Sequence, residues 1–325
     1  MKIVFLGVPQ FAAAILENLI FAGLKPVLVI TEIDKPVGRK QLLTPPLVKT
    51  TALKHGLDVS QPKTRAELRE EIAKINPDLA VVVAYGRLIP LEALKIPKYG
   101  FINVHPSLLP RWRGVSPIQH TVLAGDEETG VSIMLMDEIF DHGPVLATVK
   151  IKIDKKTITS EKLRETLTEL SGKLLTETIP KWLNGSIKPI PQENSSTTYA
   201  KMLKKEDGKI NWTKPAEEIE RQVRAFNPWP GTFTYFEISE LNPAGKIQGT
   251  SQKIIKIFKA TVLEQTEKGP FGEPGKTYLA PNEKIAVQCG KDFLIIEELQ
   301  IEGGKKMPTN EFLRGHHDFI GLILK

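Results

Sequence analysis

The sequence begins MKIVFLGVPQFAAAILENLIFAGL (residues 1–24), and this stretch decides the fold class. Residues 2–7 form an apolar run that suits a buried strand, and residues 9–22 repeat apolar side chains at helical spacing. A lysine followed by apolar residues is also typical of a secretory signal, but Pro9 and Glu17 interrupt the run. The stretch therefore predicts a strand, a tight turn and an amphipathic helix.

The same alternation continues through the first half of the chain. Further apolar runs lie at residues 26–31, 79–84 and 99–104, and residues 47–55 have a helical pattern. Strands that alternate with helices form a mostly parallel sheet through right-handed crossovers. We expect an α/β protein with a Rossmann-like N-terminal domain, whose ligands bind at the carboxyl ends of the strands. The first turn lacks the glycines of a dinucleotide fingerprint, which argues against a nicotinamide enzyme.

The rest of the chain has a different pattern. Two runs, 131–136 and 145–153, predict strands on either side of an acidic turn, and a helix is expected from about Ser160 to Leu175. Short β-rich runs then follow at close spacing, at residues 232–236, 254–262, 285–288 and 293–299. This spacing suits a small β-barrel, for which the oligonucleotide-binding (OB-like) type is one option. We expect a catalytic domain at 1–185, a linker at 186–206 and a C-terminal β-barrel domain at 207–325.

Composition sets limits on the class of protein. The 325 residues carry a net charge of +6 and contain one cysteine, Cys289. A single cysteine excludes an internal disulfide and argues against a thiolate metal cluster, so a reducing cytoplasm is expected. No apolar run approaches the length of a membrane span. Neither half of the chain is strongly basic by count, so binding of a polyanion would require the fold to gather charge on one face.

Residues 103–114, NVHPSLLPRWRG, carry the strongest functional signal. Asn103 and His105 lie two positions apart at the end of a predicted strand, so their side chains emerge on the same face. Pro106 and Pro110 restrict the backbone that follows, because each proline locks its φ angle. The pattern predicts an amide and an imidazole that point into one crevice.

These two side chains suit the transfer of an acyl group to an amine. The tetrahedral intermediate of that reaction carries negative charge on oxygen, and one fixed hydrogen-bond donor contributes roughly 3 kcal/mol to its stabilisation. Asn103 can donate that bond, while His105 can donate a second one or relay a proton. A carboxylate would orient the imidazole; Asp141 is favoured and Asp137 is the alternative. Six histidines without a cluster of ligands indicate that no metal is bound.

A polar segment rich in proline and glycine separates residues 30 and 47. It is too broken to pack, so we expect a mobile loop. One interpretation is a solvated connection. The other is that Lys35, Arg39 and Lys40 grip a substrate that carries phosphate.

Several motifs resemble those of the methionyl-tRNA formyltransferase family, in the same order along the chain. They are FINVHPSLLPRWRGVSPIQ (101–119), MDEIFDHGP (136–144), RAFNPWPG (224–231) and GKKMPTNEFLRG (304–315). Asn103, the HPSLLP segment (105–110) and Asp141 are shared with other transferases that use 10-formyltetrahydrofolate, whereas the PRWRG continuation and the C-terminal motifs point to charged tRNA. The acidic turn departs from the usual Gly-Leu-Asp-Thr-Gly, because Ile139, Phe140 and His142 replace the first Gly, the Leu and the Thr.

The resemblance implies a function and a set of site residues. Asn103, His105 and Asp141 would form the catalytic trio. The folate pocket would be lined by Ser107, Leu108, Leu109 and Pro110. Contacts to the tRNA would come from Lys35, Arg39, Lys40, Arg111 and Arg113, with Arg39 sensing the acceptor end.

The expected reaction moves the formyl group of 10-formyltetrahydrofolate to the α-amino group of methionyl-initiator-tRNA, for translation initiation. The expected protein is a cytoplasmic monomer that uses folate as its co-substrate, binds no metal and does not contact a membrane. One alternative is a folate-dependent formyltransferase that acts on a nucleotide sugar or a small amine. Another, of a different class, is a non-catalytic RNA-binding protein that kept the fold.

Overall fold

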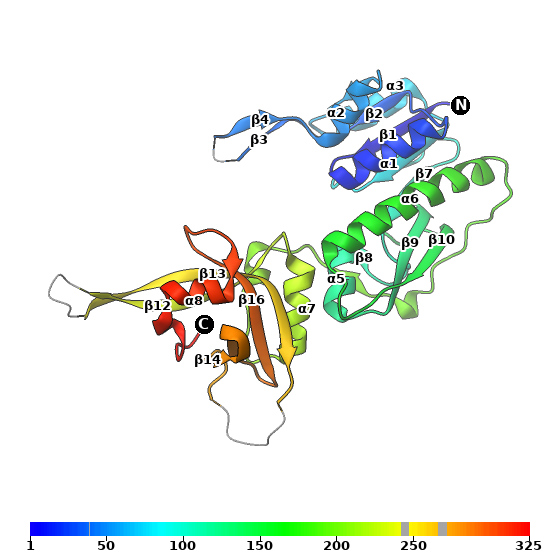
Figure 1. The fold of residues 1–325 in the computed structure, drawn as a ribbon. Coiled ribbons are helices and arrows are strands. Elements are labelled where there is room, and N and C mark those ends of the chain that lie inside the picture. The colour runs from blue at the N-terminus through cyan, green and yellow to red at the C-terminus, as the bar shows by residue number, and fades with distance from the viewer. Residues whose placement is uncertain (39, 242–246, 266–271) are drawn as a thin grey trace. The chain divides into compact units, whose positions relative to one another are not determined.

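The computed structural model describes residues 1–38, 40–241, 247–265 and 272–325. The chain divides into two compact units (Figure 1). The first unit comprises residues 1–118, 127–153 and 162–202, and the second comprises residues 119–126, 154–161 and 203–325.

A seven-stranded sheet forms the centre of the first unit, in the order β10-β9-β7-β6-β1-β2-β5. The five strands from β7 to β5 pair in parallel, whereas β9 and β10 are antiparallel additions at one edge. Its strands are β1 (Ile3–Gly7), β2 (Leu28–Ile30), β5 (Val59–Ser60), β6 (Leu79–Val83), β7 (Phe101–His105), β9 (Glu128–Leu135) and β10 (Val145–Lys152). The N-terminal sheet is therefore mostly parallel, as predicted. Strands β1 and β6 are buried along their whole length, which explains their continuous apolar runs.

The crossover helices follow the sequence pattern closely at the N-terminus and less closely later. The helices are α1 (Gln10–Phe21), α2 (Leu47–Lys54), α3 (Arg65–Ile75), α4 (Leu91–Leu94), α5 (Pro117–Ala124) and α6 (Ser160–Leu183). Helices α1 and α2 match their predicted bounds within two residues, whereas α6 runs beyond its predicted end and α3 was not predicted. Helix α3 begins at an N-cap, because the Thr64 hydroxyl accepts from the Glu67 N–H, while the Glu67 carboxylate accepts from the Lys63 N–H.

The segment predicted as a mobile loop contains a two-stranded antiparallel hairpin, β3 (Lys35–Val37) and β4 (Leu42–Thr44). Figure 1 shows the hairpin extending from the body of the first unit. Every residue of both strands is exposed. The prediction of a loop without strands was wrong, because the local pairing of Lys35 with Thr44 is not visible as an apolar pattern.

A second small sheet pairs β8 (Arg113–Gly114) in parallel with β11 (Tyr199–Ala200). A short 3-10 helix, η1 (Asn194–Ser196), precedes β11. Both elements lie in the stretch predicted as a linker, and residues 186–202 belong to the first compact unit. The predicted domain boundaries at residues 185 and 206 therefore stay a prediction. In the structure, the last segment of the first compact unit ends at residue 202.

The second unit is built on an antiparallel sheet that contains the predicted β-rich runs, while the OB-like barrel stays a prediction. The sheet order is β12-β13-β16-β15-β14, with β17 paired to β16. Its elements are η2 (Lys205–Gly208), α7 (Ala216–Phe226), β12 (Thr232–Leu241), β13 (Ile247–Leu263), β14 (Thr277–Ala280), η3 (Pro281–Glu283), β15 (Lys284–Gln288), β16 (Phe293–Ile301), β17 (Met307–Pro308), α8 (Thr309–Gly315) and η4 (His317–Phe319). Helices α7 and α8 contribute Ile219, Val223 and Phe312 to the core beneath the sheet.

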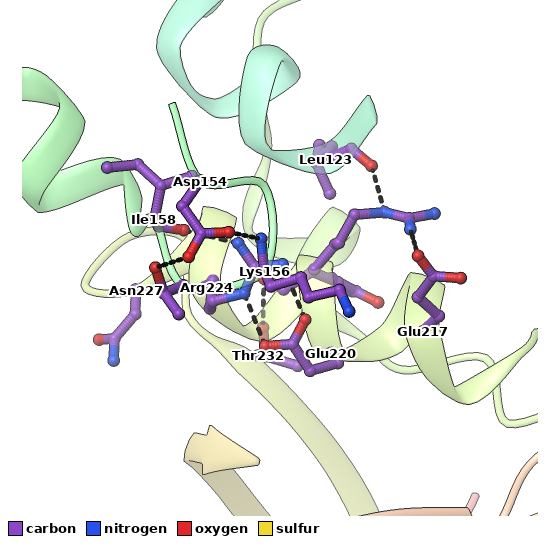
Figure 2. Close-up of polar contacts among 12 residues, drawn as sticks. Leu123, Asp154, Lys156, Ile158, Glu217, Glu220, Arg224, Asn227 and Thr232 are labelled. Atoms are coloured by element: carbon purple, nitrogen blue, oxygen red, sulfur yellow. Dashed lines mark hydrogen bonds and ion pairs between the residues drawn. The ribbon is translucent and has the colours of Figure 1, made fainter. Parts of the chain in front are cut away.

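Two arginines on α7 explain why residues 119–126 and 154–161 belong to the second unit. Arg221 donates to the Leu123 carbonyl at 3.0 Å, and Arg224 donates to the Ile158 carbonyl at 2.6 Å (Figure 2). Each guanidinium also pairs with a glutamate one turn earlier, Glu217 and Glu220 respectively. Because both arginines are largely buried, these bonds fix the backbone that they reach.

Candidate active site

Asn103 and His105 lie on β7, the strand on which the sheet changes from parallel to antiparallel pairing. Residues two apart on a strand share a face, so both side chains emerge on the same side near its carboxyl end. The Asn103 side chain is half-buried, and His105 is 4% exposed. The predicted pair therefore occupies the position that the sequence pattern indicated.

Asp141 reaches this pair from the turn between β9 and β10. One of its carboxylate oxygens accepts from the Asn103 amide at 3.2 Å, and the other accepts from the Gly114 N–H at 2.9 Å. The second oxygen also lies 3.7 Å from Nδ1 of His105. Asp141 is 8% exposed and has a φ of 52°, which is unusual for a residue with a side chain. The structure thus brings all three residues of the predicted trio together.

The hydrogen bonds of His105 define the roles of its two nitrogens. Nε2 lies 2.9 Å from the Trp112 carbonyl, and because a carbonyl oxygen only accepts, Nε2 carries a hydrogen in this arrangement. Nδ1 is consequently the nitrogen that faces the Asp141 carboxylate.

The backbone of residues 107–112 is held by side-chain hydrogen bonds. The Ser107 hydroxyl donates to the Arg111 carbonyl at 2.6 Å, and the Ser132 hydroxyl donates to the Ser107 carbonyl at 2.8 Å. The Leu109 N–H donates in turn to the Ser132 hydroxyl. These bonds fix the loop that carries the Trp112 carbonyl, and through it the ring of His105.

Gly114, at the end of this loop, occupies a position at which only glycine fits. Its φ is 125°, and a Cβ added there would lie 2.3 Å from the Ala200 carbonyl oxygen. The close pairing of β8 with β11 is thus possible only because residue 114 has no side chain. It also aims the Gly114 N–H at Asp141.

Gln192 and Asn194 support the site but were not predicted. The Gln192 amide donates to the Asp141 carbonyl at 3.0 Å and to the Gly143 carbonyl at 2.7 Å. The Arg113 guanidinium donates in turn to Gln192 and to Asn194, both at 3.0 Å. The sequence gives no periodic signal here, because the polar stretch that contains both residues also fits a solvated linker.

Asp137, the alternative carboxylate, has a structural position instead. Its side chain accepts from the Ile139 N–H at 2.9 Å and lies 2.7 Å from Nδ1 of His142. Both side chains of this pair are about one-third exposed. Asp137 therefore braces the turn that presents Asp141, whereas Asp141 is the carboxylate that faces the imidazole of His105.

A cavity of about 560 Å³ adjoins Asp141. It has an apolar wall and an arginine-containing rim, and it is lined by residues 65, 66, 69, 87–92, 94, 134 and 136–141. Ile139 and Phe140 contribute large exposed apolar surfaces to it. The predicted folate-pocket residues Ser107, Leu108, Leu109 and Pro110 lie outside this lining; Ser107 is fully buried and the other three are half-buried.

The residues predicted to contact tRNA occupy different environments. Lys35 and Lys40 are exposed on the hairpin segment, and Arg39 lies outside the described residues. Arg111 is half-buried and stacks over the Trp112 ring at 4.5 Å. Arg113 is 3% exposed, and its guanidinium bonds to Gln192 and Asn194. The burial of Arg113 argues against the predicted contact with tRNA phosphates.

A metal site needs a cluster of ligand side chains, and a membrane span needs a long apolar helix. Within residues 1–38, 40–241, 247–265 and 272–325, no group of three or more His, Cys, Asp or Glu side chains could hold a metal ion. In the same described residues, no helix is long and apolar enough to span a membrane.

The two units and the trio at the end of β7 are the architecture of an enzyme that carries a one-carbon group. The formyl transferase family model matches residues 1–179, and the model of the formyl transferase C-terminal domain matches residues 202–317. The chain therefore belongs to the formyl transferase family. The second match begins near the start of the last segment of the second unit, whereas the first match also contains residues 119–126 and 154–161 of that unit.

Similar proteins in other organisms extend over the whole chain. The methionyl-tRNA formyltransferase of Citrifermentans bemidjiense is 41% identical over 320 residues, which are 97% of this chain and 94% of that protein. The methionyl-tRNA formyltransferase of Bacillus velezensis is 40% identical over an alignment of 327 positions, which covers 99% of this chain and 97% of that protein.

Solved structures with lower identity share the fold. An N-formyltransferase from Helicobacter canadensis, in complex with folinic acid and dTDP-3-aminofucose, has a TM-score of 0.63 at 20% identity and covers 94% of this chain and all of that chain. HypX from Aquifex aeolicus, in complex with tetrahydrofolic acid, has a TM-score of 0.58 at 19% identity. That match covers 98% of this chain, which spans about half the length of HypX.

Proposed function

We propose that the protein transfers the formyl group of 10-formyltetrahydrofolate to the α-amino group of methionyl-initiator-tRNA. The observation that carries this proposal is the full-length identity of about 40% to methionyl-tRNA formyltransferases, together with the three-residue contact of Asn103, His105 and Asp141. A nucleotide sugar as acceptor is the second candidate, but the structures that suggest it are about 20% identical and share only the fold.

In the proposed reaction the amine nitrogen bonds to the formyl carbon, the bond from that carbon to the folate N10 breaks, and the proton lost by the amine replaces it on N10. The formyl oxygen is negative at the tetrahedral stage. The Asn103 amide has two N–H groups, of which one donates to Asp141. We assign the other to the formyl oxygen.

His105 and Asp141 act beside this donor. Asp141 faces Nδ1 of His105 and the Trp112 carbonyl accepts from Nε2, so these two contacts orient the imidazole beside the reacting group. Asp141 is itself held by Asn103 and Gly114, which keeps its carboxylate from moving toward the substrate. The reaction needs no covalent intermediate on the protein, because the amine attacks directly.

The cavity beside Asp141 suits the folate. A folate has a flat heteroaromatic head and a tail of glutamate carboxylates, and this cavity combines an apolar wall with three arginines, Arg65, Arg69 and Arg87. We assign the head to the wall near Met136 and Phe140, and the tail to Arg65 and Arg69, which are exposed on α3. Ser107, Leu108, Leu109 and Pro110 remain a prediction as folate contacts.

Charged tRNA would bind chiefly through its phosphates. Lys35, Arg39, Lys40 and Arg111 remain candidates for this contact, and Arg113 does not, because it is buried. In the second unit, exposed lysines on β13 and after β16 add candidates, namely Lys253, Lys256 and Lys305. Lys259 and Lys306 pair with Glu297 and Glu298 respectively, so part of their charge is already neutralised. The proposal includes a cytoplasmic monomer and an OB-like barrel in the second unit.

Radiolabelled formyl transfer tests the proposal. The purified chain is given the labelled folate donor with methionyl-initiator-tRNA, with free methionine or with a dTDP-amino sugar. We expect label on the tRNA alone, and loss of labelling by about 10²-fold or more in Asn103→Ala. Label on the sugar without label on the tRNA would favour the second candidate, and label on neither would favour a binding protein without catalysis.

A further inference from the structure

The neck of the β3–β4 hairpin is closed by side chains from three separate segments. Asp34 directly precedes β3, Lys49 lies in α2 shortly after β4, and Gln61 directly follows β5. The Lys49 ammonium donates to both Asp34 oxygens, at 2.8 and 2.9 Å, and to the Gln61 side-chain oxygen at 2.9 Å. These three bonds use all three hydrogens of the ammonium group.

Gln61 completes the arrangement through its amide nitrogen. That nitrogen donates to one Asp34 oxygen at 2.9 Å and also to the Glu32 carbonyl. The side chains of Lys49 and Asp34 are only 23% and 26% exposed, so their interaction is less screened than that of a surface ion pair. Hydrogen bonds from Lys49 and then Gln61 are the main causes that lower the pKa of the Asp34 carboxyl.

The hairpin beyond the neck is held differently. All six residues of its strands are exposed, and side-chain hydrogen bonds among its described residues are local, such as Thr44 to the Leu42 carbonyl and Gln41 to the Gly38 carbonyl. An isolated two-stranded hairpin is marginally stable in water. Its direction is therefore set where it joins the body of the first unit.

We propose that Asp34, Lys49 and Gln61 form a clasp that aims the β3–β4 hairpin at the tRNA substrate. The clasp residues are positioning residues, because they act on the substrate only through the hairpin whose base they hold. This inference rests on the proposed function for the identity of the substrate. The hairpin carries Lys35 and Lys40 beside exposed Val37, Leu42 and Leu43, a surface that combines phosphate-binding charge with apolar area.

A positioning role predicts a specific kinetic pattern. Lys49→Met keeps the length of the side chain and removes its three donors. We expect the KM for tRNA to rise about tenfold, which corresponds to about 1.4 kcal/mol. We expect kcat at saturating tRNA and the KM for folate to change less than about twofold, because the catalytic trio and the cavity do not contact the clasp. Lys49→Arg, which retains charge and donors, should restore part of the loss.

Limited proteolysis gives a second readout that does not depend on catalysis. Trypsin can cleave after Lys40 in the hairpin segment, and opening the neck should accelerate this cleavage about tenfold, since cleavage tracks the population of open states. Lys54→Met is the matched control, because Lys54 lies on the same helix but is exposed and pairs with Glu17, at 3.4 Å, instead of with the clasp residues. It should leave both the KM for tRNA and the cleavage rate unchanged.

The outcomes separate the clasp from the proposed function. If the unmodified chain formylates no tRNA, the proposed function fails, and the proteolysis comparison alone decides whether the clasp orders the hairpin. A Lys49→Met variant with unchanged tRNA KM and unchanged cleavage overturns the clasp. So does a loss of kcat that matches the loss of kcat/KM, because that pattern indicates general damage to the fold. If Lys49→Met does not fold, Asp34→Asn provides the same test with a smaller change of shape.

Discussion

The turn at residues 137–143 and the β3–β4 hairpin are two loops of the same unit with opposite construction. In the turn, Asp141 is buried, and bonds from Asn103, Gly114 and Gln192 hold its carboxylate and its carbonyl. In the hairpin, the strands are exposed and the ordered bonds gather at the neck. The difference is that bonds from distant segments fix the turn directly around Asp141, whereas bonds from distant segments fix the hairpin at its base.

The largest expected effect comes from removing a side chain of the trio that the turn helps to form. Asn103→Ala removes the proposed oxyanion donor, and Asp141→Ala removes the carboxylate beside His105; each should lower kcat by about 10² or more. Steady-state formylation of methionyl-tRNA measures the effect, with circular dichroism to confirm folding. A folded variant of either kind that retains normal kcat would remove the proposed roles.

A smaller effect is expected from loosening the turn without touching the trio. Asp137→Ala removes the bonds to the Ile139 N–H and to His142, so Asp141 should lose part of its alignment. We expect kcat to fall about tenfold, because small misplacements of catalytic groups are costly, with little change in the KM for tRNA. His142→Gln, which keeps a donor, is the control and should stay nearer to the parent. An increase of the tRNA KM at constant kcat would place Asp137 on the substrate side.

The hairpin side should respond through salt dependence and not through turnover. Lys40→Gln removes one exposed cation, so the slope of log affinity for tRNA against log salt should decrease by about 0.7 to 0.9 if Lys40 neutralises one phosphate. Filter binding at several salt concentrations measures the slope. Lys152→Gln, at the far edge strand β10, is the matched control. Equal slopes for the two variants would contradict a phosphate contact by Lys40.

The smallest expected effect concerns the difference in exposure between the buried Cys289 and the hairpin segment. Burial raises the pKa of the Cys289 thiol to about 12, so this cysteine should not react with Ellman's reagent at pH 8, whereas an engineered Lys40→Cys thiol should react readily. The Cys289 thiol ionises near pH 9 in the unfolded chain and near pH 12 in the folded chain. The contribution of the protonated thiol to the stability of the fold is therefore complete below pH 9 and is lost as the pH rises toward 12. Urea unfolding at pH 8 and pH 10 measures this loss. Rapid labelling of Cys289 in the folded chain would contradict its burial.

The sequence predicted the fold where local pattern and burial agree. The apolar runs became β1, β2, β6 and β7, and the Asn-x-His spacing placed two of the three trio residues on one strand end. Position in the chain favoured Asp141 over Asp137 only slightly, because both lie in one acidic turn and their tertiary contacts are what distinguish them.

The remaining features depend on contacts between distant segments. The resemblance implied that Arg113 contacts tRNA, but the residues that its guanidinium bonds, Gln192 and Asn194, lie about eighty positions later in the chain. The segments 119–126 and 154–161 join the second unit through Arg221 and Arg224, which no periodicity reveals. The hairpin was missed because its strands bury nothing, so they leave no alternating apolar signal.

The position of Gln192 also bears on the order in which the chain is made. During synthesis from the N-terminus, every strand of the seven-stranded sheet leaves the ribosome before Gln192 does. The amide that caps the carbonyls of Asp141 and Gly143 therefore arrives after the scaffold that it secures. A nascent chain that ended at residue 185 would contain every strand of the sheet but not the hydrogen bonds from Gln192. The shortest fragment in which the turn at residues 137–143 has all of its bonds therefore extends to about residue 202.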